Sequence, residues 1–218
     1  MVIIAVCIIV FFFGAAMWTL WEYLLHRFAM HELNGKGIMS REHLEHHVKA
    51  SWAFDYTHIL SWLGIGVVGS AVWLPLTAWI TTMLWPSGPS WLVGAAMAVG
   101  WACGYGFYEY QHAVSHLRAP TTPYQHWLRK HHFHHHFGHP RTNHGVTTAV
   151  WDKLFGTLEQ PEKVNVPRRL AMVWLLDDDG NVHSEFANDY QLIGTAHTSD
   201  RQEQIDRAKA FASIAPDP

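Results

Sequence analysis

The chain has 218 residues and a formal net charge of −3. This length suits one membrane domain with a small appendage, and the modest charge argues against a nucleic-acid partner. The two cysteines, Cys7 and Cys103, both lie in apolar stretches, which excludes a disulfide framework and a cysteine-based zinc ribbon.

The first apolar segment covers residues 2–25 and carries Glu22 as its only charge. It is long enough to cross a membrane, which takes roughly 20 mostly apolar residues. It lacks the basic start and the small-residue cleavage site of a signal peptide. We therefore expect a retained membrane anchor.

A second apolar region lies between Asp55 and Glu109, where there is no Asp, Glu, Lys or Arg. This gap has room for two membrane spans, which we place at residues 60–84 and 91–108. The proline- and glycine-containing stretch 85–90 separates them, as expected for a turn.

Ten histidines form four clusters in the order pair, triplet, pair, triplet. The clusters are His26 and His31; His43, His46 and His47; His112 and His116; and His132, His135 and His136. Imidazole suits Fe, Zn, Cu or Ni, and ten imidazoles exceed what one metal can hold. Each half of the chain offers five, so we expect two metal ions. The sequence indicates no catalytic residue beyond these ligands and no motif for binding another cofactor.

The topology follows from the two spans that separate the halves, because they return the chain to the side it left. All ten histidines can then meet on one membrane face. Basic residues follow the first span, whereas the turn between the other two spans has no charge. We therefore expect an integral membrane protein, and the positive-inside rule predicts that its metal site lies on the cytoplasmic face. In a bacterium, the membrane would be the inner one.

Histidines four residues apart share one face of a regular helix. This spacing occurs in three pairs: His43 and His47, His112 and His116, and His132 and His136. His26 and His31 are five residues apart and diverge by about 140° on a regular helix. We therefore expect one of these two at a fraying helix end.

The second triplet can be read in two registers. One register is His131, His134 and His135, and the other is His132, His135 and His136. We favour the second because an aromatic residue, Phe137, then follows the triplet directly.

Two carboxylates lie beside the histidine pairs. Glu22 precedes His26 by one helical turn, and Glu109 precedes His112 by three residues. A charge at a membrane edge is costly unless it is paired, and metal-bound histidines commonly donate their other ring N–H to a carboxylate. We expect Glu22 and Glu109 to accept such N–H groups.

The composition changes after residue 159. We therefore expect a membrane domain over residues 1–159 and a soluble extension over residues 160–218. The sequence does not indicate a role for this extension. Residues 168–185 alternate around an Asp-Gly turn and predict a β-hairpin. Ser199 and Gln202 have the spacing of a capping box and predict a helix.

Three stretches carry a resemblance to a known family. They read WTLWEYLLHRFAMH over 18–31, YEYQHAVSH over 108–116, and LRKHHFHHHF followed by GVTTAVWDKLFGTL within 128–158. With the first triplet, they resemble the fatty acid hydroxylase superfamily of integral-membrane di-metal oxygenases, and most closely its fatty acid 2-hydroxylases. In that family all four clusters supply metal ligands, so the resemblance implies this role for the ten histidines and supports the register ending at His136.

The resemblance also implies a fold and an activity. The fold is an all-α integral membrane protein with about three transmembrane helices and a cytoplasmic histidine-rich helical cap, here followed by a small α+β extension. The enzyme is a monooxygenase that uses O2 and two metal ions, with iron expected and zinc an alternative after purification. It converts C–H to C–OH on a lipid or fatty acyl substrate, with C2 as the candidate position.

Electrons for this reaction must come from elsewhere, because the chain has no flavin motif, haem-binding HPGG stretch or cysteine cluster. We expect a separate donor of the ferredoxin or cytochrome b5 type. Such carriers are usually acidic, so a basic docking face is expected at Arg129, Lys130 and Arg141.

Other functions remain open. The superfamily also contains lipid and sterol desaturases and sterol oxidases, which the sequence does not separate from hydroxylases. The non-enzyme alternative is a membrane protein that binds or transports metal, although a transporter would place its ligands at mid-membrane.

Overall fold

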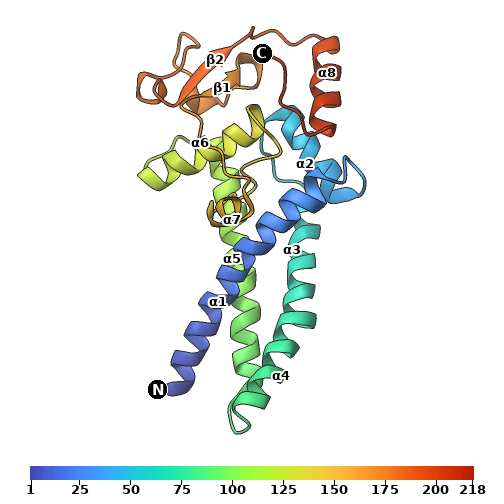
Figure 1. Cartoon of the computed structure of the whole chain (residues 1–218), viewed down its shortest axis with the longest axis vertical. Helices are drawn as coiled ribbons and strands as arrows, with labels where there is room; N and C mark the ends of the chain where they lie inside the picture. Colours follow the sequence, from blue (N-terminus) through green and yellow to red (C-terminus); the bar gives the residue numbers. More distant parts are fainter. The chain divides into compact units, whose positions relative to one another are not determined.

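The computed structural model describes residues 1–218, most of which form helices (Figure 1). The chain divides into two compact units. The first holds residues 1–21 and 53–110, and the second holds residues 22–52 and 111–218. All ten clustered histidines belong to the second unit.

The extension predicted from residue 160 onward does not form a unit of its own, since its residues belong to the second unit. The domain boundary at residue 159 stays a prediction.

The first unit is helical and draws on four α-helices. These are α1 (Val2–Leu24), α3 (Tyr56–Val68), α4 (Leu74–Leu84) and α5 (Ser90–Leu117). A π-helical turn, η2 (Gly69–Trp73), joins α3 to α4 without a break. The predicted turn at 85–90 separates α4 from α5.

The helices of the first unit pack closely where glycine removes the side chain. A Cβ atom at Gly100 in α5 would collide with the main-chain carbonyl of Phe11 in α1. Around this approach, the Trp18 ring meets the rings of Trp101 and Tyr105 edge-on, with both centroid distances at 5.0 Å. Edge-to-face pairs of this kind stabilise an aromatic core.

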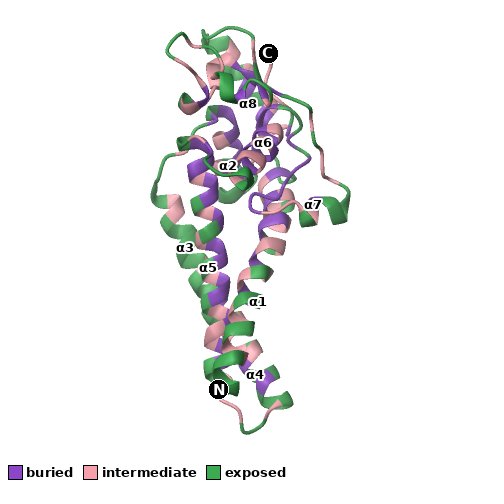
Figure 2. Cartoon of the chain, turned by 90° about the vertical axis from the view of Figure 1, so that its left-hand side faces the viewer, coloured by how far each residue is buried: buried purple, intermediate pink, exposed green.

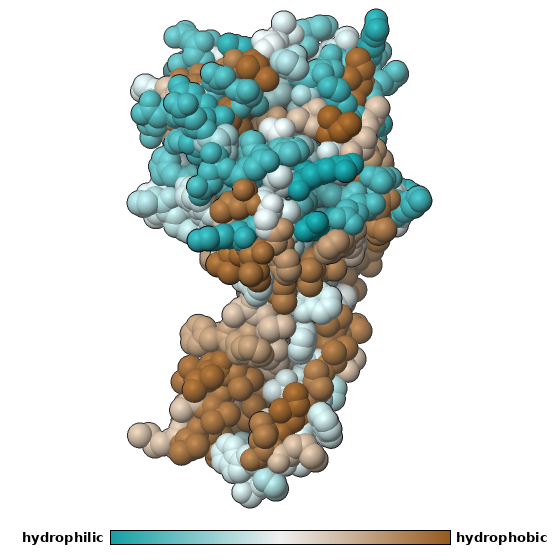
Figure 3. Space-filling model, in the orientation of Figure 1, coloured by the Kyte–Doolittle hydropathy of each residue, from teal (hydrophilic) through white to brown (hydrophobic).

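Two helical segments, Val2–His31 and Tyr56–Leu84, are long and apolar enough to cross a membrane. Only 11% of the most apolar window of each is buried, so these side chains face outward, unlike those of a soluble core helix. Figures 2 and 3 show this exposed, hydrophobic surface on the first unit. Helix α5 is long enough but richer in glycine and tyrosine than these two segments, so the count of three spans stays a prediction.

The second unit contains further helices besides the end of α5. They are η1 (Leu25–His31), α2 (Ile38–Lys49), α6 (Pro123–Phe137), α7 (Val150–Phe155) and α8 (Asp200–Phe211). The side chain of Thr122 caps α6 by accepting the Gln125 N–H. The predicted cap of α8 is confirmed, because Ser199 Oγ accepts the Gln202 N–H at 3.2 Å.

The hairpin predicted at 168–185 is wrong as a pair of strands. That stretch holds short 3-10 helices and a single antiparallel bridge between Leu176 and Val182. The 3-10 helices are η3 (Arg168–Leu170), η4 (Val173–Leu175) and η5 (Ser184–Phe186). The Asp-Gly turn itself is present, and Asp177 Oδ1 accepts the N–H groups of Asp179 and Asn181.

The two strands of the unit lie on either side of this stretch. They are β1 (Val164–Pro167) and β2 (Tyr190–Ile193), which pair in parallel with Val164 opposite Tyr190. The pairing is parallel because the residues between the strands fold into the core instead of forming a hairpin. Leu175 and Phe186, from two of the 3-10 helices, are fully buried there.

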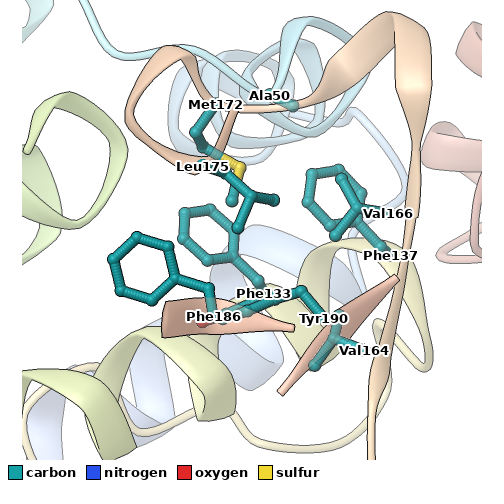
Figure 4. Packing of buried hydrophobic residues seen from close by; sticks show 9 residues of the cluster. All are labelled: Ala50, Phe133, Phe137, Val164, Val166, Met172, Leu175, Phe186 and Tyr190. Carbon is teal, nitrogen blue, oxygen red and sulfur yellow. The ribbon is translucent and has the colours of Figure 1, made fainter. Parts of the chain in front are cut away.

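This core binds the small sheet to α6 (Figure 4). Phe133 and Phe137 of α6 stack at 5.8 Å and pack with Val164 and Val166 of β1 and with Tyr190. Burial of such side chains contributes roughly 1.5–3 kcal/mol each. The extension therefore fixes the helix that carries the second histidine triplet.

Candidate metal centre

The structure brings the ten histidines together as two groups of five. The first group is His26, His31, His43, His47 and His135, and the second is His46, His112, His116, His132 and His136. Within each group, the candidate ligand nitrogens lie within 4.8 Å of one another, so each group could hold one metal ion. The rings of His47 and His136 stack at 4.1 Å, which makes the groups neighbours.

The groups do not follow the two halves of the sequence, because His46 and His135 exchange places. Helix geometry explains this. In a triplet at positions i, i+3 and i+4, the outer two residues lie about 40° apart, whereas the middle one diverges by about 100° from the last. Each triplet therefore gives its outer histidines to one group and its middle histidine to the other.

The first pair shares a group because the helix changes form at that point. Residues Leu25–His31 form the π-helix η1, in which the Glu32 N–H bonds to the Arg27 carbonyl. A π-helix hydrogen-bonds residue i to i+5 and so returns residues five apart to nearly the same face. The rings of His26 and His31 lie 5.2 Å apart and both are buried, so the predicted divergence of about 140° is wrong.

Main-chain carbonyls fix the orientation of four rings. In the first group, Nδ1 of His26 donates to the His144 carbonyl at 2.5 Å, and Nδ1 of His135 donates to the Thr142 carbonyl at 2.7 Å. A carbonyl only accepts, so these Nδ1 atoms carry the hydrogen and the Nε2 atoms of the neutral rings carry a lone pair.

The second group repeats the arrangement. Nδ1 of His46 donates to the Ser51 carbonyl at 2.8 Å, and Nδ1 of His116 donates to the Ala50 carbonyl at 3.1 Å. Ala50 ends α2 in the left-handed conformation with φ 48°, which turns both carbonyls toward these rings.

The Nε2 atoms face one another across short distances. His135 Nε2 lies 3.0 Å from that of His31 and 3.1 Å from that of His47. In the second group, His116 Nε2 lies 2.9 Å from that of His132. Lone pairs that meet in a buried space repel unless a cation binds between them.

These distances fit a shared metal ion. Two nitrogen ligands at about 2.1 Å from one metal, and at right angles to each other, lie about 3.0 Å apart. His136 adds to the argument, because both of its ring nitrogens are buried without a hydrogen-bond partner. A buried unpaired polar group is costly, and coordination of one nitrogen would remove most of that cost.

The rings are neutral, as metal binding requires. Burial, and then the neighbouring imidazoles, holds their pKa well below the ordinary value of histidine. This applies to His43, His47, His132, His135 and His136.

Two histidines of the alternative register, His131 and His134, lie outside both groups, whereas His135 is common to both registers. His131 Nε2 lies 3.4 Å from Asp152 Oδ2. His134 Nε2 contacts a Glu159 carboxylate oxygen at 2.8 Å, and His139 Nδ1 contacts the other at 2.8 Å. The assignment of the favoured register as metal ligands belongs to the proposal below.

Glu22 holds a loop and does not contact His26. Its buried carboxylate accepts the N–H groups of Val146 and Thr147 at 2.5 and 2.7 Å, and the Thr147 hydroxyl at 2.8 Å. These donors occupy it, while His26 uses the His144 carbonyl.

Glu109, in the first unit, accepts the Tyr105 hydroxyl at 2.9 Å and lies 3.9 Å from His58 Nε2. Its predicted contact with His112 stays a prediction.

Sequence reasoning missed the residues that shape the loop after α6. Asn143 adopts φ 55°, and its side chain makes two hydrogen bonds with the main chain of Glu159, at 2.8 and 2.9 Å. Asn143 thereby fixes the loop between Thr142 and His144, whose carbonyls orient two histidines of the first group. The available signal was the residue type, since asparagine tolerates the left-handed region.

Asp152 supports the same loop from α7. It is fully buried and accepts the N–H groups of His144 and Gly145, each at 2.8 Å. Burial alone would raise the pKa of Asp152, but the nearby His131 ring and the Gly145 N–H hold it below the ordinary value. The buried Asp152 carboxylate therefore holds this loop in position.

The predicted docking face is wrong for Arg129. This side chain is buried and donates to the carbonyls of Arg118 and Val114. Lys130 pairs with Asp189 at 2.7 Å. Arg141 is exposed, with one guanidinium N–H on a carbonyl, so it alone of the three projects a largely solvated charge.

Comparison with known proteins gives one family match and several relatives. The model of the fatty acid hydroxylase family matches residues 11–157. A dihydroceramide fatty acyl 2-hydroxylase of Arabidopsis thaliana is 29% identical over 67% of this chain and 59% of its own length. The fatty acid 2-hydroxylase of Homo sapiens is 27% identical over 70% of this chain and 40% of its own.

Among solved structures, full-length Scs7p, with only its hydroxylase domain visible, aligns with a TM-score of 0.46 and 26% identity. That alignment covers 73% of this chain and 58% of the other. The chain thus spans about half the length of the curated relatives it matches. Because the family match covers most of the chain and includes all ten clustered histidines, the chain belongs to the fatty acid hydroxylase family.

Proposed function

We propose that this protein is an O2-dependent membrane hydroxylase that converts C–H to C–OH on a lipid acyl chain. Its two groups of five histidines hold two metal ions, expected to be iron, with zinc able to replace it during purification. The observation that carries the proposal is the convergence of buried Nε2 lone pairs, because a cation between them accounts for both their spacing and their burial.

A redox-active metal pair supplies the activation of O2, which no side chain can provide. The residues of the chain do the rest. Carbonyls of residues 142, 144, 50 and 51 hold four rings with Nε2 turned inward. The histidines themselves are mostly buried, which keeps bulk water from the centre.

The position of hydroxylation is proposed as C2 of the acyl chain. The support is the naming of the relatives as fatty acid 2-hydroxylases and dihydroceramide fatty acyl 2-hydroxylases. We extend this to the substrate class, a fatty acyl chain free or within a ceramide-like lipid.

For the membrane, we propose three spans, with α5 as the third and the histidine groups on the cytoplasmic face. The two strongly apolar segments and the basic residues after the first of them support this arrangement. In a bacterium the membrane would be the inner one.

The test is expression in a host that lacks 2-hydroxylated lipids, followed by mass spectrometry of its lipids under 18O2. Wild type should produce 2-hydroxyacyl lipids carrying one 18O atom, and His136→Ala should produce none. A product that has lost two hydrogens without 18O would identify a desaturase. Bound metal with unchanged lipids would point to a metal-binding protein and contradict the proposal.

Electron supply can be tested with the purified protein. Hydroxylation needs two electrons per O2, so lipid, O2 and a nicotinamide cofactor alone should give no turnover. Adding ferredoxin, or cytochrome b5, with its reductase should start turnover. Turnover without any protein donor would contradict the proposal of a separate electron carrier.

A further inference from the structure

The C-terminal part of the chain, residues 158–218, lies outside the family match, yet one of its side chains reaches the first histidine group. Ser213 Oγ lies 3.0 Å from His31 Nδ1. Both residues are buried, with exposed fractions of 5% and 2%. The hydroxyl therefore stands at the nitrogen of His31 that faces away from the other ligand atoms.

The backbone at Ser213 has a conformation that is uncommon for serine. The Ser213 N–H bonds to the Ala210 carbonyl at 2.8 Å, and the Ile214 N–H bonds to the Lys209 carbonyl at 2.9 Å. This pattern ends helices with a left-handed residue that is usually glycine, sometimes asparagine. Ser213 adopts φ 52°, a conformation that its Cβ disfavours.

The helix before Ser213 is fixed to α2, which carries the first triplet. Arg207 of α8 forms an ion pair with Glu45 of α2. The Phe211 ring covers Gly35, where φ is 82° and a Cβ would lie 2.6 Å from that ring. The hydroxyl thus has a defined position.

The other end of the extension is also fixed. Arg169 makes two hydrogen bonds to Asp206 of α8, at 2.7 and 2.9 Å, and both side chains are nearly fully buried. Two paired hydrogen bonds set the orientation of both partners. Helix α8 therefore has little freedom to move Ser213 away from His31.

We propose that residues 199–214 belong to the metal centre and that Ser213 is a positioning residue for His31. Its hydroxyl accepts the Nδ1–H, which leaves the Nε2 lone pair directed at the first metal position. This inference rests on the proposed function, because it assumes that His31 is a metal ligand. His26 and His135 use main-chain carbonyls for the same purpose, so Ser213 is the partner that substitution can remove.

The test compares Ser213→Gly and Ser213→Ala with wild type and with Ser199→Ala. Glycine suits φ 52° better than serine, so Ser213→Gly should fold at least as stably. Ser199→Ala removes the cap at the start of α8 and leaves the Ser213 hydroxyl in place. It is the matched control for a general loosening of the helix.

Each full-length protein is purified in detergent, loaded with Zn2+, and challenged with a chromogenic chelator while a thermal scan records its stability. In both Ser213 variants, one metal ion of the pair should leave about 10-fold faster, with the other unchanged. Ser199→Ala should lower the thermal midpoint without this faster phase.

Release from Ser213→Gly at the wild-type rate would overturn the inference while leaving the proposed function standing. Equal acceleration in Ser199→Ala would also overturn it, because Ser213 would then act only through the packing of α8. Wild type that binds no metal would refute the proposed function and this inference together.

Discussion

The two histidine groups differ in what holds their rings from outside. In the first group, the Nδ1 atoms of His26, His31 and His135 each have a hydrogen-bonding partner. Those partners belong to the loop 142–144 and to the end of the chain at Ser213, both remote in sequence from the first pair.

In the second group, adjacent main-chain carbonyls hold two of the rings. His46 and His116 donate to the carbonyls of residues 50–51, where α2 ends. The Nδ1 atoms of His132 and His136 are buried without a hydrogen-bond partner. We therefore expect the first metal ion to be bound more tightly, since partners of this kind raise ligand basicity and fix ring orientation.

Removal of a ligand should have the largest effect. His135→Ala and His136→Ala should each lower activity at least about 100-fold, more than the loss of an outer hydrogen bond. His135→Ala should empty the first position, and His136→Ala the second, as measured by metal content per chain. Loss of the same metal ion from both variants would contradict the assignment of His135 and His136 to different groups.

His134→Ala is the matched control, because His134 shares the helix but contacts Glu159 instead of a metal group. It should retain both metal ions and most activity. An inactive His134→Ala beside an active His136→Ala would establish the alternative register.

A smaller, selective effect is expected from Asp152→Asn. The amide would place a donor against an N–H of the loop, which should reduce the free energy of unfolding by about 1–3 kcal/mol. Through the His144 carbonyl, it should also weaken binding of the first metal ion about 10-fold and spare the second. Denaturation and chelator competition measure the two effects, and equal weakening of both metal ions would contradict the proposed division.

The smallest effect is expected from Glu159→Gln. This carboxylate contacts two histidines outside the groups, but its side chain is 42% exposed. Exposed pairs contribute less than about 1 kcal/mol. Both metal ions should stay bound with wild-type release rates, and loss of either one would show that the metal centre extends to this surface.

Much of the helical framework could be predicted from hydropathy and turn residues. The segments before residue 25 and on either side of the turn at 85–90 are helices as expected. The stretch 168–185 could not be predicted, because local alternation suggested a hairpin while burial of Leu175 and Phe186 decided the fold.

The candidate site was predictable in composition but not in arrangement. The spacing of each triplet already implies that its middle histidine points elsewhere, so the exchange of His46 and His135 could have been derived. The π-helix at Leu25–His31 could not, because a regular helix is the expectation for that sequence. The roles of Asn143 and Ser213 could not be predicted from the sequence, because only the tertiary fold brings these residues to the histidines.

The most direct test of the central claim is anomalous X-ray diffraction at the absorption edge of the bound metal. We predict two peaks within one chain, each surrounded by the Nε2 atoms of one interleaved group. His46 should then lie beside the peak that His112 shares, and His135 beside the peak that His26 shares. A single peak, no peak, or two peaks divided between the halves of the sequence would contradict the account.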